Sequence, residues 1–284
     1  MTVRYVALGS SMAAGPGITP RANGAPWPAG RSARNYPHLV AAQLGLDLVD
    51  VTYSGATTAH VLRDRQFGAP PQVEALDGSE SLVTVTIGGN DVGYLPLLTA
   101  ACLPGPAQWV PVLGCRIRDL RNRSAREHAL GDVAESLNEV GDTVRRRAPS
   151  ARVLFVDYLT LLPPAGRKAS PLSNADADLG RYIAAALEEH TADAAGATGC
   201  EVVKAGEASR DHHAWSVDPW TRRFGAPWPG RPAPLHPNAA GMRAVADLVT
   251  AQVGDGLSSG APWSSCASWR RSSSSIDAID DAGS

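Results

Sequence analysis

The chain alternates between short apolar segments and amphipathic ones, and this alternation constrains its fold more than any other feature. Helical patterns lie between the apolar segments, and we expect the longest two to begin at the N-caps Asp132 and Asn174. The alternation predicts one doubly wound α/β domain, a three-layer α/β/α sandwich around a mainly parallel sheet. Its buried strands are predicted from five segments: "VRYVALG" from Val3, "LDLVDVTYSG" from Leu46, "SLVTVTIGGND" from Ser81, "ARVLFVDYL" from Ala151 and "CEVVKAG" from Cys200.

The chain has 284 residues, of which 44% are hydrophobic, so it is long enough for one sizeable core. We place that domain at residues 1–254. Residues 255–284 are rich in serine and lack periodicity, which predicts a disordered tail. Residues 102–131 and 207–235 break the alternation; we expect an insertion over one sheet edge and a Pro/Trp-rich functional loop, respectively.

Charge and hydropathy limit the classes of partner that the chain can bind. The net charge is −2 with both signs scattered, so no basic patch indicates nucleic acid or an anionic membrane. No apolar run approaches the ~20 residues that span a bilayer. We therefore expect a monomer acting on a small, mostly uncharged molecule. No signal peptide follows Met1, which predicts a cytoplasmic protein, or a secreted one if a signal peptide has been removed.

The cysteines give an open prediction. Cys102, Cys115, Cys200 and Cys266 lack the CxxC spacing of metal sites, so we expect no bound metal. A Cys102–Cys115 disulfide is favoured among the pairings, because the intervening segment is short and contains glycine and prolines. Reduced thiols are an equally supported alternative.

Chemistry-bearing residues begin in "GSSMAAGPG", from Gly9. This stretch matches neither the P-loop pattern nor GxGxxG, and it contains no lysine, which argues against phosphate binding. Ser11 instead stands at the end of the first predicted strand. The helix that follows offers backbone N–H groups to an oxyanion, so Ser11 is a candidate nucleophile.

Three later segments place complementary groups at the same sheet edge. Gly55 in "YSGATT" lets a backbone N–H approach a ligand, and Asn90 in "TIGGND" carries a donor amide. His236 in "PLHPNAAG" precedes the last helix and is a candidate general base. We expect these groups to converge with Ser11, because such strand ends border the ligand crevice of open α/β sheets. Asp91 is expected to hold its loop through hydrogen bonds.

With Ser11, Gly55, Asn90 and His236 in this order, the chain resembles the SGNH hydrolases, also called GDSL-like lipases and esterases, across residues 1–254. It is most similar to the actinobacterial type, which has "GGNDVGY" and then a cysteine pair. The resemblance implies a flavodoxin-like fold with about five strands and no cofactor. It also implies an acyl-enzyme on Ser11, proton transfer by His236, and an oxyanion hole made by the N–H groups of Ser11 and Gly55 and the Asn90 side chain.

The chain departs from the family at two positions. Ser10 stands where the family has aspartate, and we expect this to affect only the local loop. The family's D-x-x-H motif would place an aspartate at Ala233. Some relatives use a backbone carbonyl instead, so we expect the carbonyl of Ala233 to orient His236. Asp211 and Asp218 are the alternative partners.

The expected function is a metal-independent serine hydrolase that cleaves carboxylic esters with short or medium acyl chains. A thioesterase or a carbohydrate deacetylase would use the same residues. A catalytically decayed module that binds glycan or lipid is the alternative from another class. We expect Trp27, Trp215, Trp220 and Trp228 to line an apolar acyl pocket, although loop tryptophans also cap cores.

Overall fold

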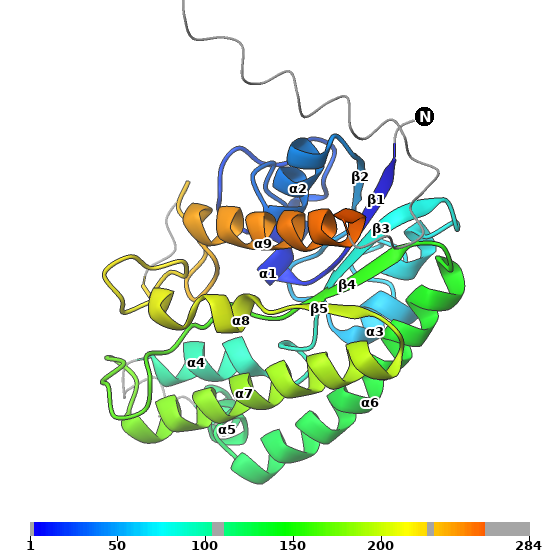
Figure 1. Cartoon of the computed structure of the whole chain (residues 1–284). Coiled ribbons are helices and arrows are strands. Elements are labelled where there is room, and N and C mark those ends of the chain that lie inside the picture. Colours follow the sequence, from blue (N-terminus) through cyan, green and yellow to red (C-terminus); the bar gives the residue numbers. More distant parts are fainter. Residues whose placement is uncertain (1–2, 104–110, 226–229, 259–284) are drawn as a thin grey trace, which may run out of the picture.

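Five parallel strands form the central sheet in the order β2-β1-β3-β4-β5 (Figure 1). The computed structural model describes residues 3–103, 111–225 and 230–258. The chain moves from β1 to one side of the sheet and then returns to the other, so the strand order reverses between β1 and β3. Open α/β sheets bind ligands at such a point. The strands are β1 (Arg4–Gly9), β2 (Asp47–Asp50), β3 (Glu80–Thr86), β4 (Arg152–Val156) and β5 (Glu201–Val203).

Helices cover both faces of the sheet (Figure 1). On one face α2 (Tyr36–Leu44) packs against α9 (Ala239–Ser258). On the other lie α3 (Thr58–Leu62), α4 (Tyr94–Ala101), α6 (Arg123–Arg147) and α7 (Asn174–Ala197), with α5 (Pro111–Leu120) against α4 and α6. The short elements are α1 (Ser11–Ala14), α8 (Ala205–Ala208) and the single turns η1 (Trp27–Ala29), η2 (Gln72–Ala75) and η4 (Arg210–His212).

The core is divided between the two faces of the sheet. Along β4, Val153 and Phe155 belong to the cluster beneath α6 and α7, whereas Leu154 and Val156 belong to the cluster beneath α2 and α9. Successive side chains of a strand point to opposite faces, and here both faces are buried. This explains why the strand segments are apolar throughout. The predicted three-layer sandwich is confirmed.

Two helix starts differ from the predictions. α6 begins at Arg123, where the side chain of Asn122 accepts a hydrogen bond from the N–H of Ala125 at 3.2 Å. Asp132 therefore lies inside this helix and is not its N-cap. α7 is capped by Ser173, whose Oγ accepts from the N–H of Asp176 at 3.1 Å, one residue before the predicted cap.

The boundaries of the predicted loops also change. The segment 102–131 was expected to be an irregular insertion, but α5 and the first turns of α6 occupy most of its described part. Leu130 continues the buried face of α6 formed by Val133 and Leu137, so packing extends this helix toward its N-terminus. α9 runs past residue 254 to Ser258. The rest of the predicted tail, 259–284, lies outside the described residues.

The predicted Cys102–Cys115 disulfide is wrong, because both residues are free thiols. Cys102 is buried at the C-terminal end of α4, where burial raises its pKa to about 11. Cys115 is exposed on α5, and the Arg118 guanidinium donates to its Sγ at 3.2 Å. The two side chains thus occupy opposite environments. Cys200 is also free, and Cys266 lies outside the described residues.

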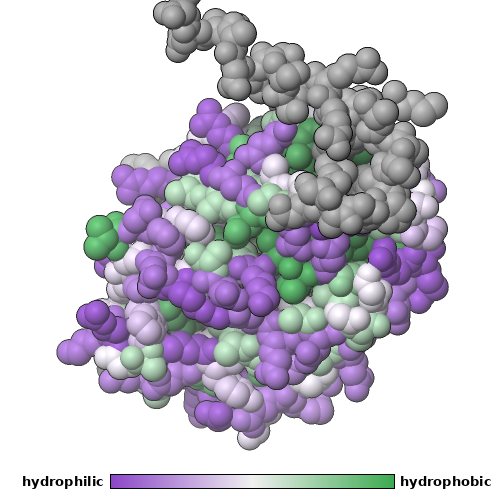
Figure 2. Space-filling model, in the orientation of Figure 1, coloured by the Kyte–Doolittle hydropathy of each residue, from purple (hydrophilic) through white to green (hydrophobic). Residues whose placement is uncertain are grey.

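Hydrophilic residues cover most of the face in Figure 2, and hydrophobic ones lie between them in small patches. Within the described part of the chain, none of the helices has both the length and the apolar character needed to cross a membrane.

Candidate active site

The backbone that leads into Ser11 is fixed on both sides. Gly9, the last residue of β1, has φ 147° and lies so close to β3 that a Cβ would come within 2.5 Å of the Thr86 carbonyl oxygen. The Gln72 side-chain amide accepts from the Gly9 N–H at 2.7 Å and donates to the Gly9 carbonyl at 3.0 Å. The next N–H, that of Ser10, donates to the Thr86 carbonyl at 2.9 Å. These contacts set the position from which α1 begins at Ser11.

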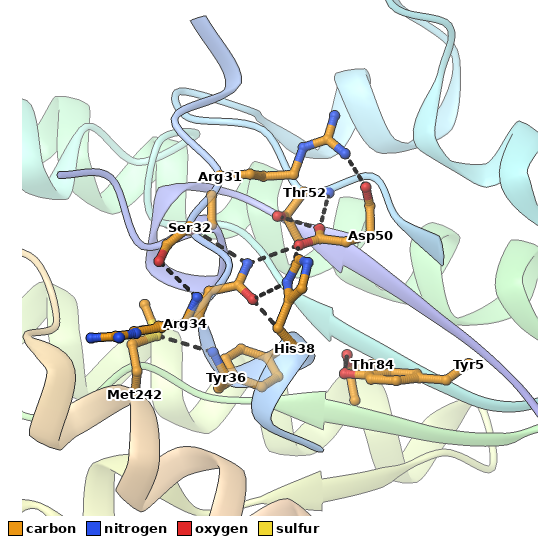
Figure 3. A network of polar contacts seen from close by, with 12 residues as sticks. Tyr5, Arg31, Ser32, Arg34, Tyr36, His38, Asp50, Thr52, Thr84 and Met242 are labelled. Carbon is orange, nitrogen blue, oxygen red and sulfur yellow. Dashed lines mark hydrogen bonds and ion pairs between the residues drawn. The ribbon is translucent and has the colours of Figure 1, made fainter. Parts of the chain in front are cut away.

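A polar network that includes His38, Asp50 and Thr52 lies between α2 and the end of β2 (Figure 3), and Ser32 and Asn35 connect it to α1. The Ala14 carbonyl accepts hydrogen bonds from the backbone N–H of Ser32 and from the side-chain amide of Asn35, at 2.9 and 3.4 Å. Asn35 also donates to the Asp50 carboxylate at 2.8 Å, and its Oδ1 accepts from the ring of His38 at 2.7 Å. Because buried hydrogen bonds are costly to break, this network restrains the helix that carries Ser11.

His236 reaches Ser11 from the loop before α9. Its Nε2 lies 2.8 Å from Ser11 Oγ, and its Nδ1 lies 2.7 Å from the Pro234 carbonyl oxygen. A carbonyl oxygen can only accept, so Nδ1 carries the proton and Nε2 is free to accept the Ser11 hydroxyl proton. The structure thus brings the candidate nucleophile and the candidate base into direct hydrogen-bond contact.

The predicted role of the Ala233 carbonyl is wrong, because Pro234 supplies the carbonyl that orients the ring. The Ala233 carbonyl instead accepts from the backbone N–H of His236, at 3.3 Å. Leu235 has a left-handed φ of 63°, which closes a tight turn and leaves the Pro234 oxygen facing Nδ1. A side-chain pattern does not reveal such a turn.

Neither alternative carboxylate serves His236. The Asp218 carboxylate lies 3.4 Å from the ring of His212, and Asp211 is exposed on η4. Burial lowers the pKa of His236 below its ordinary 6.5, and the hydrogen bond to Pro234 only partly opposes this. His236 is therefore neutral at neutral pH, the state that a general base requires.

The loops after β2 and β3 bring the two other motif residues together. The Asn90 side-chain amide donates to the carbonyl of Ala56, the residue after Gly55, at 2.8 Å. An amide nitrogen has two hydrogens, so one remains for a substrate oxygen. Gly55 has φ 78°, and the nearest atom to a Cβ at this position would be 3.7 Å away. The positive φ, rather than a lack of room for a side chain, therefore explains why glycine occupies this position.

Asp91 holds this pair of loops as the sequence predicts. Its carboxylate accepts from the Thr58 hydroxyl at 2.6 Å and from the Thr58 N–H at 3.0 Å. Burial raises the pKa of Asp91, and these hydrogen bonds oppose the rise. Asp91 thus connects the Asn90 loop to the start of α3.

Tyr158 is a site residue that the sequence did not reveal. Its hydroxyl accepts from the Gly89 N–H at 3.0 Å and lies 3.2 Å from Ser10 Oγ, so it joins the loops that carry Asn90 and Ser11. A Cβ on Gly89 would lie 2.2 Å from the Tyr158 ring. Burial raises the pKa of Tyr158 to about 12, which keeps its hydroxyl protonated. The available signal was a tyrosine two residues after β4, a position also typical of core residues.

The predicted tryptophan pocket is not found in the described residues. Trp215 donates from its ring to the Ser170 carbonyl at 3.1 Å, and Trp220 stacks on His212 with centroids 4.0 Å apart. Trp27 is 80% exposed. Trp228 lies outside the described residues. Trp215 and Trp220 pack against the two core clusters, as the capping alternative predicts, and Trp27 faces solvent.

Two cavities flank the site, and neither is lined by Ser11 or His236. The first, of about 300 Å³, is mainly apolar and lies between α7 and the loop after β4, with Tyr158 as one wall. Leu159, Leu161, Leu162, Ala184 and Leu187 line it, and Arg181, Glu188 and Arg210 contribute charged groups. The second, of about 420 Å³, lies on the opposite side of β1 and includes Tyr53 and Gln72. The described residues hold no cluster of side chains suited to a metal ion.

Residues 7–244 match the GDSL-like lipase/acylhydrolase family. The chain belongs to this family. Lipase 2 of Streptomyces coelicolor is 35% identical over 252 residues, which cover 87% of this chain and 84% of that protein. The chain is therefore a carboxylic ester hydrolase of the SGNH/GDSL type.

Solved structures agree with this assignment. Phospholipase A1 from Streptomyces albidoflavus NA297 is 27% identical with a TM-score of 0.70, covering 89% of this hydrolase and 99% of that chain. An extracellular lipase from Streptomyces rimosus is 26% identical with a TM-score of 0.71, at the same coverages. The predicted family and α/β architecture are thereby confirmed.

Proposed function

We propose that this hydrolase cleaves esters through an acyl-enzyme on Ser11, with His236 as the general base. The contact between Ser11 Oγ and His236 Nε2 carries the proposal. As Oγ attacks the ester carbonyl carbon, Nε2 takes the hydroxyl proton, and the imidazolium then returns it to the leaving alkoxide. In deacylation, Nε2 takes a proton from the attacking water and returns it to Ser11 Oγ as the acyl–oxygen bond breaks, so the carboxylic acid leaves and His236 is neutral again.

The oxyanion would be stabilised by the Asn90 amide and by the N–H groups of Gly55 and Ser11. Ser11 is the first residue of α1, and the first N–H groups of a helix have no acceptor within it. The positive charge that forms on His236 is stabilised by a hydrogen bond to the Pro234 carbonyl rather than by a carboxylate. Because a carbonyl oxygen has only a partial negative charge, the basicity of His236 depends more on its burial and orientation than it does in a triad.

We further propose that the apolar cavity beside Tyr158 receives the acyl chain, in place of the expected tryptophan pocket. Ala184 lines it from α7, so Ala184→Phe should fill it and reduce kcat/KM on p-nitrophenyl octanoate about 10-fold, with little change on the acetate. Ala192→Phe, on an exposed position of the same helix, is the control. An equal loss on both esters would argue against this pocket.

The decisive test of the mechanism compares Ser11→Ala with Ser10→Ala. Ser11→Ala should lose at least about 10³-fold in kcat on p-nitrophenyl butyrate, because the nucleophile and base act as a unit. The Ser10 hydroxyl is bonded to Tyr158, whereas the ring nitrogens of His236 are bonded to Ser11 and Pro234, so Ser10→Ala should keep most of the activity. A fluorophosphonate should add once to the wild type and not to folded Ser11→Ala. Activity that survives in Ser11→Ala would refute the mechanism.

The alternatives share this site and separate by substrate. A preference for acyl thioesters would favour a thioesterase, and one for acetylated sugars a deacetylase. A folded wild type that is inert to every ester and to the phosphonate would instead support the alternative of a module that binds glycan or lipid.

We also propose that the hydrolase acts as a monomer on a small ester. Within the described ranges the exposed large apolar residues are few: Trp27, Phe67, Tyr182 and Val217. Sedimentation tests this.

A further inference from the structure

The cavity proposed for the acyl chain contains polar groups that the proposed mechanism does not use. Its lining follows α7 from Arg181 to Thr191, which is about 15 Å of helix. Tyr94, the first residue of α4, lines it from the other side. The backbone N–H of Tyr94 donates to the Gly89 carbonyl at 2.9 Å, so the cavity borders the loop that carries Asn90.

Two side-chain hydroxyls of this lining are unpaired. Tyr94 is 1% exposed and Thr191 is 6% exposed, and neither hydroxyl has a hydrogen-bond partner among the described residues. The unpaired atoms that the protein encloses completely, such as Arg126 Nε, do not include them. Each hydroxyl oxygen therefore keeps some free surface, and the cavity is the space that both residues line. Because buried polar groups almost always have a partner, these hydroxyls are available to a ligand or to water.

The charged side chains of the same cavity do not favour a charged ligand. Arg210 donates to the Glu188 carboxylate at 2.6 Å, and Arg181 donates to the Asp178 carboxylate at 2.5 Å. The charges of the lining also balance, since Arg181 and Arg210 are matched by Glu188 and Asp211. The cavity therefore offers a ligand two neutral hydroxyls within an otherwise mainly apolar lining.

A plain hydrocarbon chain matches only part of this lining. Leucines such as Leu161 and Leu187 suit its methylene groups. The same chain would displace water from the hydroxyls of Tyr94 and Thr191 and give no hydrogen bond in return, which weakens binding. A hydroxyl group on the chain both donates and accepts, so it can replace that water whichever partner supplies the proton.

We infer that this cavity selects acyl chains that carry a hydroxyl group, and that Tyr94 and Thr191 recognise this hydroxyl. The inference rests on the proposed function, because it deepens the assignment of the cavity to the acyl chain. The preferred substrates would be esters of hydroxy fatty acids rather than esters of plain fatty acids. Since the two hydroxyls come from different helices, they would meet different positions along the chain.

Esters that differ only in the acyl chain test the inference: ethyl octanoate, ethyl 3-hydroxyoctanoate and ethyl 7-hydroxyoctanoate. The wild type should prefer at least one hydroxy ester, with kcat/KM at least about 3-fold above that on ethyl octanoate. Tyr94→Phe and Thr191→Val each remove one hydroxyl and keep the shape of the side chain. At least one of these variants should lower that preference about 3- to 10-fold. Neither should lower kcat/KM on ethyl octanoate, because a hydrocarbon chain then leaves one hydroxyl fewer unpaired.

Tyr5→Phe and Thr198→Val are the matched controls. The Tyr5 hydroxyl is bonded to Thr84 Oγ1 at 2.8 Å, and the Thr198 hydroxyl donates to a backbone carbonyl at the end of α7 at 2.7 Å. Neither residue lines the cavity, so both variants should melt at a lower temperature without a change in preference among the esters. Tyr94→Phe and Thr191→Val should melt close to the wild type, because no hydrogen bond within the protein is lost. A lower melting temperature with an equal loss on all three esters would show a structural role and overturn the inference.

Binding to folded Ser11→Ala separates this inference from the mechanism. Octanamide, 3-hydroxyoctanamide and 7-hydroxyoctanamide, titrated by NMR, should shift signals of the segments around Tyr94 and Thr191. At least one hydroxy amide should bind about 3-fold more tightly than octanamide. Such selective binding together with surviving activity in Ser11→Ala would refute only the nucleophile. Equal binding of the three amides, no binding of any, or a preference among the esters that neither Tyr94→Phe nor Thr191→Val changes would overturn the inference.

Discussion

His236 Nδ1 lies 2.7 Å from the carbonyl oxygen of Pro234, two residues earlier in the chain. This contact performs two tasks that a carboxylate performs in a triad: it fixes the tautomer and it fixes the ring plane. It does not add a negative charge. Burial, the largest influence on His236, then lowers its pKa without a counter-ion to raise it.

The first prediction concerns the pH dependence of hydrolysis. His236 must be neutral to accept the Ser11 proton, so activity is lost as pH falls through its pKa. Because burial lowers that pKa, the acid limb of kcat/KM should have its midpoint below 6.5. A pH profile on p-nitrophenyl butyrate measures it. A midpoint above 6.5 would mean that a carboxylate, and not the Pro234 carbonyl, faces the ring.

Ala233→Asp restores the family's carboxylate position and gives a second prediction. The Pro234 oxygen already occupies the hydrogen-bonding position at Nδ1, so we expect kcat to rise by less than about 10-fold. Ala233→Asn controls for side-chain size. A larger gain for aspartate alone, with an acid limb shifted to higher pH, would show that the loop rearranges to form a triad.

A third prediction addresses the oxyanion. Asn90→Ala should lower kcat by about 10²- to 10³-fold with little change in KM, because the amide acts on charge that develops in the transition state. Its other hydrogen bond, to the Ala56 carbonyl, is also lost. Thermal melting therefore accompanies the kinetics. Rates that fall only in proportion to unfolded protein would contradict a role in the oxyanion hole.

Much of the site could be predicted because it depends on strand ends. Ser11, Gly55 and Asn90 each follow a strand of one parallel sheet, so the hydrophobic pattern alone places them at one edge. His236 follows no strand and lies in the loop before α9, so its contact with Ser11 was expected from the order of the family's motifs. The partner of His236 could not be predicted, since it depends on the left-handed φ of Leu235, and leucine gives no such signal.

The role of Tyr158 and the start of α6 are two further features that the sequence did not predict. A tyrosine after an apolar strand is typical of a core, and only the short distance to Gly89 reveals its hydroxyl as a bridge between loops. The start of α6 was misplaced because the charged turn from Arg123 lacks an apolar stripe of its own. Tertiary packing extends that helix, and local propensity does not report it.

Tyr158→Phe provides a fourth prediction, for a positioning residue. The loss of the hydroxyl leaves the Gly89 N–H without its acceptor and frees Ser10 Oγ. We expect kcat to fall about 10-fold with KM on p-nitrophenyl acetate nearly unchanged, because an unpaired buried N–H costs roughly 1–3 kcal/mol and the Asn90 loop shifts to relieve it. Tyr94→Phe, which also lines the acyl cavity, is the control. A change confined to KM would assign Tyr158 to substrate binding instead.

The last prediction concerns stability at the end of β4. Asp157 is 4% exposed, and burial raises its pKa from 3.8 to about 7, although its Oδ1 accepts from the Gly206 N–H at 2.7 Å. A raised folded-state pKa means that the folded chain binds the proton more tightly. The resulting stabilisation of the fold is fully present below pH 3.8 and is lost as pH rises through about 7.

Asp157→Asn keeps the hydrogen-bond acceptor and removes the charge. At pH 8 this variant should melt at least about 2 °C above the wild type, with the gap closing by pH 5. Asp211→Asn, at an exposed position, should show no such pH-dependent gain; a gain equal to that of Asp157→Asn would trace the effect to net charge rather than to burial.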